Sequence, residues 1–305
     1  MKSLCSLVAL FLFLSIATTA QTIELQFNKS SYNGGYNISC NGATDGSITM
    51  IVIGGTSPYT YQWSNGATTK DISNLAAGTY DVTVTDDNSV TATGSVTLLQ
   101  PGVLGRTLTP SNYNGYNIAI YGGNNGNINL SVSGGTPPYS FLWSNSATTE
   151  DINNLVAGNY SVTVTDMNNC TVTGSISMTQ PTQLTISSIT SPTNAGGFNI
   201  SCYGGSDGSI TVTPSGGVAP YSYVWTHGPT TNPLTAQRAG TFTVRVSDAN
   251  SASVTGTITL TQPTEIQISL TRSVYSNNYN TSCHNCSNGY INSSVSGGVS
   301  PYSYT

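Results

Sequence analysis

Cysteine offers the most chemistry in this sequence. After residue 20 it occurs at five positions, namely Cys40, Cys170, Cys202, Cys283 and Cys286. An odd number of cysteines in an oxidising compartment leaves one thiol free or paired with another chain. Cys283 and Cys286 form a Cys-x-x-Cys pair, a spacing that zinc sites and dithiol redox sites both use. The sequence has no second pair of this kind, so the spacing gives zinc or redox chemistry little support.

Three turns rich in aspartate and asparagine offer oxygen ligands for a hard cation. Their residues are Asp86, Asp87, Asn88, Asp166, Asn168, Asp248 and Asn250. Calcium takes about six to eight oxygen ligands, which one such turn cannot supply alone. Aspartate and asparagine also stabilise turns by accepting hydrogen bonds from their own backbone. Both interpretations stay open, so calcium is the single cofactor that the sequence suggests, and otherwise we expect none.

Catalysis has weaker support than metal binding. The two histidines, His227 and His284, lie in no nucleophile, metal or carboxylate-pair motif. An active site in a repeated module should recur in every copy, whereas His227 has no counterpart in the first two copies. We therefore expect a protein that is not an enzyme.

These residues lie in a sequence that repeats. The motif Gly-Gly-x-x-Pro-Tyr begins at Gly54, Gly134, Gly216 and Gly297, with spacings of 80, 82 and 81 residues. A fixed period of this length predicts tandem structural modules. We expect a signal peptide at 1–20, module 1 at 21–101, module 2 at 102–181, module 3 at 182–263, and an incomplete module 4 at 264–305.

Each module reads as short β-strands. In module 1 the predicted strands are 47–53, 59–63, 79–85 and 93–98, and a further strand precedes each module core. Residues 71–78 read as a short connection with apolar anchors at Ile72 and Leu75. About seven short strands and no helical period predict an immunoglobulin-like β-sandwich, repeated as an elongated all-β array. The expected core aromatic residues are Trp63, Trp143 and Trp225.

Aligning the modules places the cysteines in two columns. Cys40 marks the first column and Cys170 marks the second, 50 residues further along the module. Each complete module keeps one cysteine of the two, because the other column holds Val90, Ile120 or Ala252. One interpretation is a lost disulfide within each module, which leaves buried thiols. The other is that these cysteines pair between modules or between chains.

Three strings of module 1 carry a family resemblance. They are Cys-x-Gly-x-x-x-Gly-Ser-Ile-Thr from Cys40, Gly-Gly-x-x-Pro-Tyr-x-Tyr-x-Trp-Ser-Asn-Gly from Gly54, and Leu-x-Ala-Gly-x-Tyr-x-Val-Thr-Val-Thr-Asp-x-Asn from Leu75. The module resembles the SprB-type repeat of large cell-surface adhesins of gliding Bacteroidetes, over nearly all of residues 30–305. The resemblance implies a sandwich fold, an extracellular location and a role in adhesion or surface assembly. The chain departs from the family in the one cysteine that each complete repeat lacks.

The N-terminal segment and the charged residues indicate where the protein acts and which partners are not expected. Lys2, the apolar run at 4–16 and the small residues up to Ala20 predict a secretory signal peptide, which is too short to span a membrane. Charged residues make up 6 % of the sequence, and the seven Lys and Arg are scattered, so nucleic-acid binding is not expected. We expect a secreted protein at the cell surface with no membrane span.

These observations predict a structural or adhesive protein, either the stalk of a cell-surface adhesin or a subunit of an extracellular filament. The alternative is an array of carbohydrate-binding modules that stack sugars on aromatic rings. Expected partners are other copies of the chain, joined head to tail or by strand addition, or cell-surface and glycan ligands. The half module at the end is explained by a longer parent protein or by completion from a neighbouring chain. Glycosylation sequons, which would matter in a glycoprotein, begin at Asn28, Asn37, Asn129, Asn159, Asn169, Asn199, Asn280, Asn285 and Asn292.

Overall fold

The computed structural model describes residues 22–226 and 228–305. The predicted signal peptide and His227 lie outside these residues. Within them the chain forms twenty β-strands and three short 3-10 turns, and no α-helix. The protein is therefore all-β, as the alternating apolar pattern predicts.

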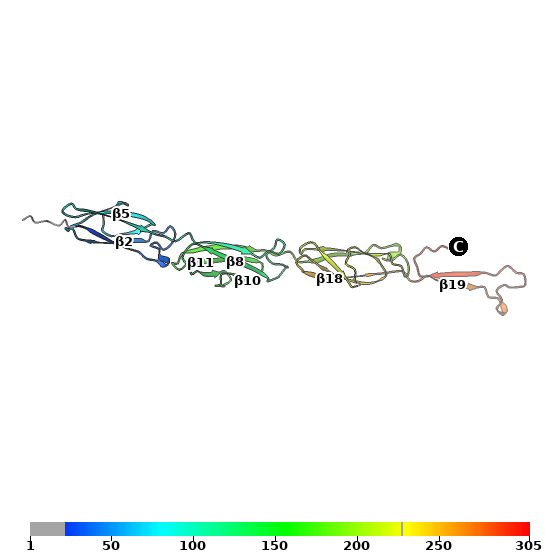
Figure 1. The fold of residues 1–305 in the computed structure, drawn as a ribbon. Helices are drawn as coiled ribbons and strands as arrows, with labels where there is room; N and C mark the ends of the chain where they lie inside the picture. The colour runs from blue at the N-terminus through cyan, green and yellow to red at the C-terminus, as the bar shows by residue number, and fades with distance from the viewer. Residues whose placement is uncertain (1–21, 227) are drawn as a thin grey trace, which may run out of the picture. The chain divides into compact units, whose positions relative to one another are not determined.

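Module 1 is built from two three-stranded sheets that face each other. One sheet has the order β1-β2-β4 and the other has the order β3-β5-β6. The strands are β1 (Glu24–Lys29), β2 (Gly46–Ile53), β3 (Thr60–Trp63), β4 (Ile72–Leu75), β5 (Gly78–Thr85) and β6 (Thr91–Leu98). Figure 1 shows β2 and β5 on opposite sides of this sandwich. All pairings in the two sheets are antiparallel, which allows each strand to place one face in the core.

The core of module 1 lies between these sheets. Ile48 on β2 and Val84 on β5 are fully buried, and Trp63 on β3 is 1 % exposed. The Phe27 ring meets the Trp63 ring edge-on, with 6.3 Å between centroids. Burying a large aliphatic side chain stabilises a fold by about 1.5–3 kcal/mol, so the inward-facing positions of these short strands each contribute to the stability of the module.

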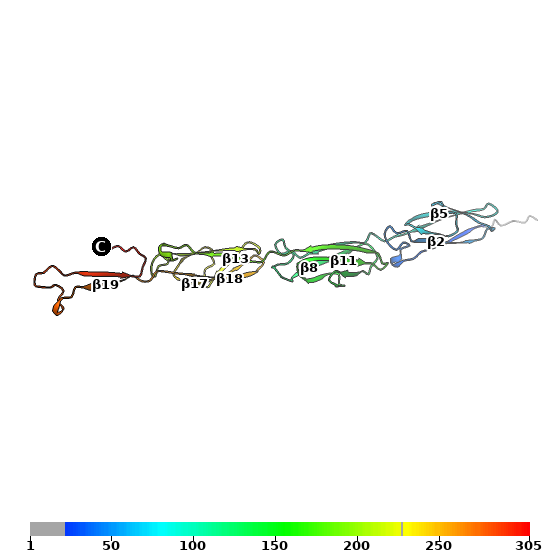
Figure 2. The same ribbon diagram turned by 180° about the vertical axis from the view of Figure 1, so that it is seen from behind.

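Modules 2 and 3 repeat the same strand order. In module 2 the strands are β7 (Gly105–Pro110), β8 (Gly126–Ser133), β9 (Ser140–Trp143), β10 (Ile152–Leu155), β11 (Gly158–Thr165) and β12 (Thr171–Met178), in sheets β7-β8-β10 and β9-β11-β12. In module 3 they are β13 (Thr185–Thr190), β14 (Gly208–Ser215), β15 (Ser222–Trp225), β16 (Leu234–Gln237), β17 (Gly240–Ser247) and β18 (Ser253–Leu260), in sheets β13-β14-β16 and β15-β17-β18. Figure 2 shows β13 and β17 from behind.

The structure corrects the strand prediction. Each complete module has six strands instead of about seven, and the segment predicted to be a connection contains β4. This strand has buried residues only at its two ends, Ile72 and Leu75, so it lacks the alternation that marks a strand in sequence. Its register against β2 shifts between Gly46 and Ser47, and Asn74 has a φ of 58°. The irregular backbone explains why the pattern did not predict it.

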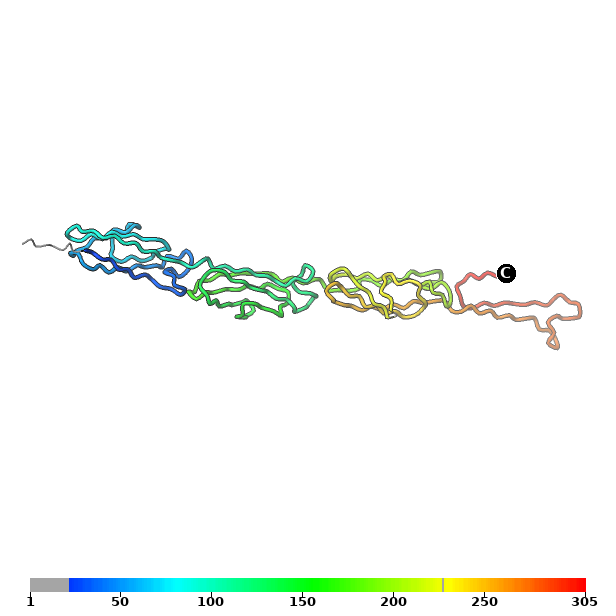
Figure 3. Tube along the Cα trace, in the orientation of Figure 1, coloured from blue at the N-terminus to red at the C-terminus, as the bar shows by residue number. Residues whose placement is uncertain are grey.

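Module 4 contains a single hairpin within the described residues. β19 (Gln267–Arg272) pairs with β20 (Ile291–Ser296), and no other strand joins this sheet. Figure 3 shows this hairpin and the loop that follows it at the red end of the trace. The loop between the two strands holds the 3-10 turn η3 (Ser276–Asn278), and the equivalent turns of modules 1 and 3 are η1 (Asn33–Gly35) and η2 (Ala195–Gly197).

The contacts within the chain form two compact units, and each unit contains a different part of module 2. Unit 1 consists of the residues up to 108 with 130–150 and 161–175. Unit 2 consists of 109–129, 151–160 and 176–305. The contacts between modules 1 and 2 described below lie inside unit 1, and those of module 3 with its two neighbours lie inside unit 2.

Candidate functional site

The repeated Gly-Gly-x-x-Pro-Tyr motif folds into a closed loop, here called the Gly-Gly loop. In module 1 the Tyr59 hydroxyl donates a 2.6 Å hydrogen bond to the carbonyl oxygen of Gly54. The same bond closes the loops at Tyr139, Tyr221 and Tyr302. Gly54 has a φ of 80°, and a Cβ built on it would collide with the carbonyl oxygen of Thr22. The first glycine is therefore required by both its backbone conformation and the chain that passes over it.

An aspartate turn, here called the Asp turn, packs against each of the first three Gly-Gly loops. Asp86 Oδ2 accepts the backbone N–H of Thr56 at 2.9 Å, and Oδ1 accepts those of Asn88 and Val90 at 2.9 and 2.8 Å. The two equivalent carboxylates, Asp166 and Asp248, each accept three backbone N–H groups in the same way. Each carboxylate thus ties a turn between two strands to the loop that precedes the tryptophan strand.

The Asp86 carboxyl titrates below its ordinary range. Burial by itself raises the pKa of Asp86, and the backbone N–H groups of Val90, Thr56 and Asn88 outweigh burial and lower it. The ionised form is therefore the one that the fold stabilises. This carboxylate acts as a cap for the turn.

The same capping role is seen at the other acidic loop. Ser39 N–H donates to Asp45 Oδ1 at 3.1 Å, and Ser201 N–H donates to Asp207 Oδ1 at 3.2 Å. Burial raises the pKa of Asp45, but hydrogen bonds from Ser39 and Tyr32 bring it below its ordinary value. Hydrogen bonds from Ser201 lower the pKa of Asp207.

Three of the predicted calcium residues, Asp86, Asp166 and Asp248, are thus engaged with backbone N–H groups, whereas the Asn88 side chain donates to Thr56 Oγ1 and Asp87 is exposed. In the described part of the chain, no group of three or more His, Cys, Asp and Glu side chains comes together that would hold a metal ion. The turn-capping interpretation accounts for the position of Asp86, Asp166 and Asp248. Calcium binding at these turns stays a prediction, tested below by chelation.

Asn168 joins module 2 to module 1. Its Nδ2 donates at 3.2 Å to the carbonyl oxygens of Asn33 and Ser39 in module 1, and to Thr136 Oγ1 in its own module. Its Oδ1 accepts the Asn33 backbone N–H at 3.0 Å. Asn33 Nδ2 in turn donates to the carbonyl oxygen of Met167 at 3.3 Å. One asparagine side chain therefore uses its donor and acceptor groups to fix two loops against each other.

A disulfide closes the same junction. Cys40 is bonded to Cys170, and their Cα atoms are 5.7 Å apart. Cys40 lies in the loop that we name the first-column loop (residues 39–43, with equivalents 119–123 and 201–205), and Cys170 is the fifth residue of the Asp turn. The interpretation that each module lost an internal disulfide is wrong for this pair. The two columns face each other across consecutive modules, so a module needs only one cysteine to take part.

The junction between modules 2 and 3 repeats the asparagine contacts without the disulfide. Asn250 Nδ2 donates to the carbonyl oxygens of Tyr113 at 3.3 Å and Ala119 at 2.8 Å, the positions equivalent to Asn33 and Ser39. Asn114 Nδ2 adds a 2.6 Å hydrogen bond to Asn250 Oδ1. The two cysteine columns here hold Ile120 and Ala252, which line one shallow groove. Apolar residues thus stand at both cysteine positions of this junction.

The glutamine that ends each module holds the first-column loop. Gln100 Oε1 accepts the Gly42 N–H at 2.8 Å, and Gln180 and Gln262 accept the equivalent Gly122 and Gly204 N–H groups at 2.9 and 3.0 Å. The proline that follows each glutamine has no N–H and limits the backbone. The linker therefore lies fixed on the loop that contacts the next module.

The three predicted core tryptophans lie inside the modules. Trp63, Trp143 and Trp225 are 1–2 % exposed, and each indole N–H donates to a backbone carbonyl of the next loop, with distances of 2.9, 2.9 and 3.0 Å. These rings present no face to a sugar. Tyr121 and Tyr203, at equivalent positions beside the first-column loops, are 55 % and 56 % exposed.

The remaining cysteines differ from the Cys40–Cys170 pair. Cys283 and Cys286 are bonded to each other within one loop of module 4. Cys202 is a free, exposed thiol in the first-column loop of module 3. Its position in the module is that of Cys40.

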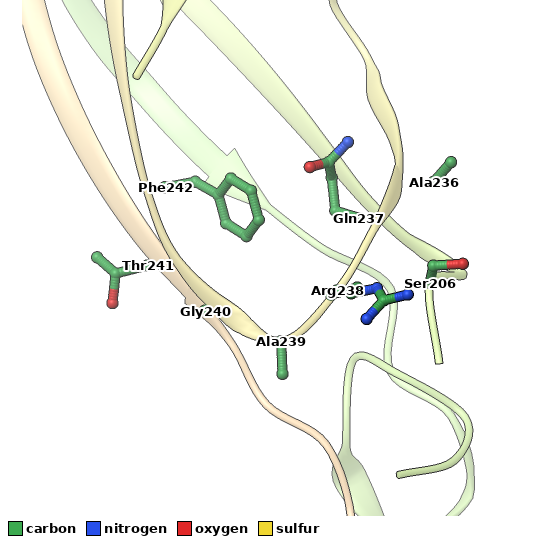
Figure 4. Close-up of a pocket in the computed structure, with 8 residues that line it drawn as sticks. All are labelled: Ser206, Ala236, Gln237, Arg238, Ala239, Gly240, Thr241 and Phe242. Atoms are coloured by element: carbon green, nitrogen blue, oxygen red, sulfur yellow. The ribbon is translucent and has the colours of Figure 1, made fainter. Parts of the chain in front are cut away.

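A shallow pocket opens in module 3 where Phe242 replaces the tyrosine of modules 1 and 2. In those modules Tyr80 and Tyr160 donate hydrogen bonds to the carbonyl oxygens of Ala76 and Val156 at 3.0 and 3.1 Å. Figure 4 shows the Phe242 ring on one side of the pocket and the Arg238 guanidinium with Ser206 on the other. Its lining holds no carboxylate and no histidine, so it lacks the groups for acid–base chemistry.

Two equivalent sequon asparagines, Asn37 and Asn199, are engaged in the fold, and Asn199 Oδ1 accepts the Thr261 N–H at 2.9 Å. The Asn37 side chain is 7 % exposed, donates to the Ser30 carbonyl oxygen at 2.8 Å and accepts the Leu99 N–H at 3.0 Å. A glycan here would replace one of the two hydrogens of Nδ2 on a side chain that the fold almost fully buries.

The sequence analysis reached this junction only through the open alternative that the cysteines pair between modules. It named Asn168 and Asn250 as calcium ligands, and it left the pairing of Cys40 and Cys170 open. It missed Asn33, Ser39 and their equivalents, whose contribution is mainly backbone and leaves no mark in residue type. The junction could have been predicted from the cysteine columns by comparing the first column of one module with the second column of the next module.

The SprB repeat family model matches residues 36–68, 121–148 and 199–230. Each of the three complete modules contains a SprB repeat match. Each SprB repeat match holds the Gly-Gly loop and the core tryptophan and ends before the Asp turn. SprB repeats imply a cell-surface or extracellular protein, and a disulfide between modules fits that location. Comparison with curated proteins found no match.

Among solved structures, the SprB-repeat chain is similar to the N-terminal eight Ig domains of Down Syndrome Cell Adhesion Molecule, with 11 % identity, a TM-score of 0.29, and coverage of 83 % of this chain and 49 % of that one. It is also similar to a tetra-tandem repeat in the extending region of a large adhesion protein, with 14 % identity, a TM-score of 0.26, and coverage of 91 % and 88 %. Likeness of this size carries no information on function. In the described part of the chain, no helix is long and apolar enough to cross a membrane.

Proposed function

We propose that this protein is a load-bearing stalk segment of a cell-surface adhesin. The observation that supports the proposal is the junction, in which the Asp turn of one module is held by the first-column loop of the module before it. A binding protein would be expected to use its loops for a ligand. Here the loops at these ends are used to fix the modules to each other.

The disulfide changes how a pulling force would travel. Tension that enters at the N-terminus reaches Cys40, crosses the bond to Cys170 and continues along module 2. The residues between the two cysteines, which are 130 positions apart in sequence, then carry no tension. Such a bypass limits the length released when modules 1 and 2 unfold, which suits a tether that must not lengthen under load.

Single-molecule pulling on residues 21–305 tests this role. At about 3.5 Å per extended residue, the segment between the two cysteines has a contour length of roughly 450 Å, and the disulfide prevents it from extending. We expect the fully unfolded chain to be shorter by that amount than the same chain with Cys40→Ser and Cys170→Ser. The variant Cys202→Ser, which removes the free thiol, should leave the length unchanged. Equal lengths for all three chains would reject the load-bearing bypass.

Glycan binding is a second candidate, favoured by the exposed rings of Tyr121 and Tyr203. Exposed aromatic rings at repeated positions are a common sugar platform. A glycan microarray with the chain and with its Tyr121→Ala, Tyr203→Ala variant separates the two roles. Glycan binding by the original chain that the variant loses would support a glycan-binding array. If neither chain binds a glycan, the stalk role is favoured. Electron microscopy of the purified chain tests the filament role, which requires assembly into fibres.

A further inference from the structure

Module 3 departs from modules 1 and 2 in the segment that enters β17. Gln237 stands at the position of a leucine that both other modules bury, Arg238 at the position of an apolar residue, and Phe242 at the position of a tyrosine. The residues of modules 1 and 2 at these positions are Leu75, Ala76 and Tyr80, and Leu155, Val156 and Tyr160. Three changes of chemical type therefore fall close together in the chain.

The three changed residues line one pocket. Gln237, Arg238 and Phe242 surround a cavity of about 420 Å³ together with Ser206 and neighbouring residues of the same segment (Figure 4). Pockets that bind small molecules have volumes of about 300–1,000 Å³, so this cavity has room for one. The changes therefore act at a single place on module 3.

The surface at this place is open in every complete module. Val156 is 52 % exposed, and Ala76 and Thr79 are exposed, although a complete module follows each of them. The contacts that join one module to the next use the first-column loop and the Asp turn instead. The pocket therefore belongs to the side of module 3 and not to a junction.

The backbone beside the pocket has a conformation that alanine disfavours. Ala236 has a φ of 60°, and the equivalent Asn74 and Asn154 have φ of 58° and 56°. Asparagine tolerates this left-handed conformation better than alanine does. Ala236 lines the pocket, so its short side chain leaves space that an asparagine would fill. Strained backbone that is kept in this way is typical of ligand sites.

The charge of the pocket suits an anion. Its lining holds the Arg238 guanidinium and no carboxylate. Asp207, next to Ser206 in sequence, accepts the Ser201 N–H with its two carboxylate oxygens at 3.2 and 3.3 Å. Module 3 balances two arginines, Arg238 and Arg245, with two aspartates, whereas module 1 has two lysines and six acidic residues. An anion is therefore repelled less by module 3 than by module 1.

We propose that this pocket binds a uronic acid unit of an acidic polysaccharide. The planar Arg238 guanidinium presents paired N–H donors that match the two oxygens of a carboxylate. Gln237 Nε2 donates to the Thr235 carbonyl oxygen at 2.7 Å, which leaves Oε1 as an acceptor for a sugar hydroxyl. The Ser206 hydroxyl both donates and accepts, and the Phe242 ring is an apolar wall for the C–H groups of the sugar. This inference does not depend on the load-bearing role, and it uses other residues than the exposed tyrosines considered above.

The test titrates residues 21–305 with tetragalacturonate and, as the uncharged control, with its full methyl ester. Isothermal titration calorimetry measures both affinities. We expect saturable binding of the acid and at least about tenfold weaker binding of the ester, because the ester has no charged carboxylate for Arg238 to bind. Added salt should weaken binding of the acid and leave that of the ester unchanged. Equal affinity for the two probes, or no binding of the acid, overturns the proposal.

Variants of module 3 assign the binding to the pocket. Arg238→Ala should weaken binding of the acid at least about tenfold. Arg245→Ala is the matched control, since it removes the same charge from module 3 at an exposed position outside the pocket lining, and it should leave the affinity unchanged. The triple variant Gln237→Leu, Arg238→Ala, Phe242→Tyr gives module 3 the residues that fold in module 1, so it should keep the circular dichroism spectrum and lose the binding. An equal loss in Arg245→Ala would show that net charge holds the probe, against the proposal.

Two further measurements separate this site from its rivals. Tyr121→Ala, in module 2, should bind tetragalacturonate as the original chain does, and a loss there would assign the probe to the exposed tyrosines. N-acetylglutamate carries a carboxylate without a sugar ring, so we expect it to bind more weakly than tetragalacturonate. Equal affinity for N-acetylglutamate would assign the pocket to acidic peptides and overturn the sugar as its ligand.

Discussion

Cys40 and Cys170 belong to consecutive modules, and their disulfide brings Cα atoms 130 positions apart in sequence to within 5.7 Å. The first-column loop of one module therefore contacts the Asp turn of the next module. Asn168 and Asn250 make the same contacts at two junctions, one with a disulfide and one without. The disulfide reinforces a junction that hydrogen bonds already specify.

Replacing Cys40 and Cys170 with serine should destabilise the first two modules. The chain-entropy model gives up to about 5 kcal/mol for a closed loop of this length. Urea unfolding of the variant and of the original chain measures the difference. Cys202→Ser is the matched control and should unfold like the original chain, because Cys202 is a free thiol. An unchanged urea midpoint for the double variant would contradict the stabilising role.

Asn168→Ala should loosen the junction more than Asn88→Ala loosens module 1. Asn88 Nδ2 donates only within its module, to Thr56 Oγ1 at 2.9 Å, whereas Asn168 reaches Asn33 and Ser39. These hydrogen bonds are exposed or part-buried, so losing each costs about 0.5–1.5 kcal/mol. Hydrogen exchange should therefore speed up at residues 33–39 in Asn168→Ala and stay unchanged there in Asn88→Ala. Equal exchange in both variants would show that Asn168 does not hold module 1.

Gly134→Ala should be far more damaging than Gly122→Ala. Both glycines have left-handed backbone, with φ of 66° and 70°. A Cβ on Gly122 meets nothing within 4 Å, whereas one on Gly134 collides with the Val103 carbonyl oxygen. The left-handed conformation costs an alanine about 1–2 kcal/mol in either place. The collision adds about 1–3 kcal/mol, so thermal unfolding should separate the two variants, and identical melting would refute the close approach.

Acidification should destabilise the protein through its capping carboxylates. The pKa values of Asp45, Asp86 and Asp207 lie below their ordinary value in the folded protein. Their stabilisation is therefore present above the unfolded pKa of about 3.9 and is lost as the pH falls through the folded pKa values. Asp86→Asn should lower stability at neutral pH and flatten its dependence on acid, measured by unfolding at several pH values. Asp87→Asn, at an exposed neighbour, should do neither.

Chelation separates the two interpretations of the Asp turns. Because Asp86, Asp166 and Asp248 accept backbone N–H groups, we expect the same melting temperature with calcium and with a chelator. A fall in melting temperature on chelation, restored by calcium, would establish a calcium role for these turns.

The sequence predicted what depends on residue type and period. Alternating apolar residues predicted the strands that carry Trp63 and Val84, and the repeated motif predicted the modules. The strand Ile72–Leu75 was missed because its short irregular backbone breaks the alternation. The hydrogen bonds of the junction were missed because their acceptors are main-chain carbonyls, such as that of Ser39, which every residue has. Cysteine columns were informative only once they were compared between neighbouring modules.

Peptide mapping under non-reducing conditions tests the junction most directly. Alkylated protein that has never been reduced, isolated as a monomer before proteolysis, should yield a linked pair containing Cys40 and Cys170, with Cys202 alkylated. Finding Cys40 and Cys170 alkylated, or each bonded to a different partner, would show that the two modules are not joined in this way.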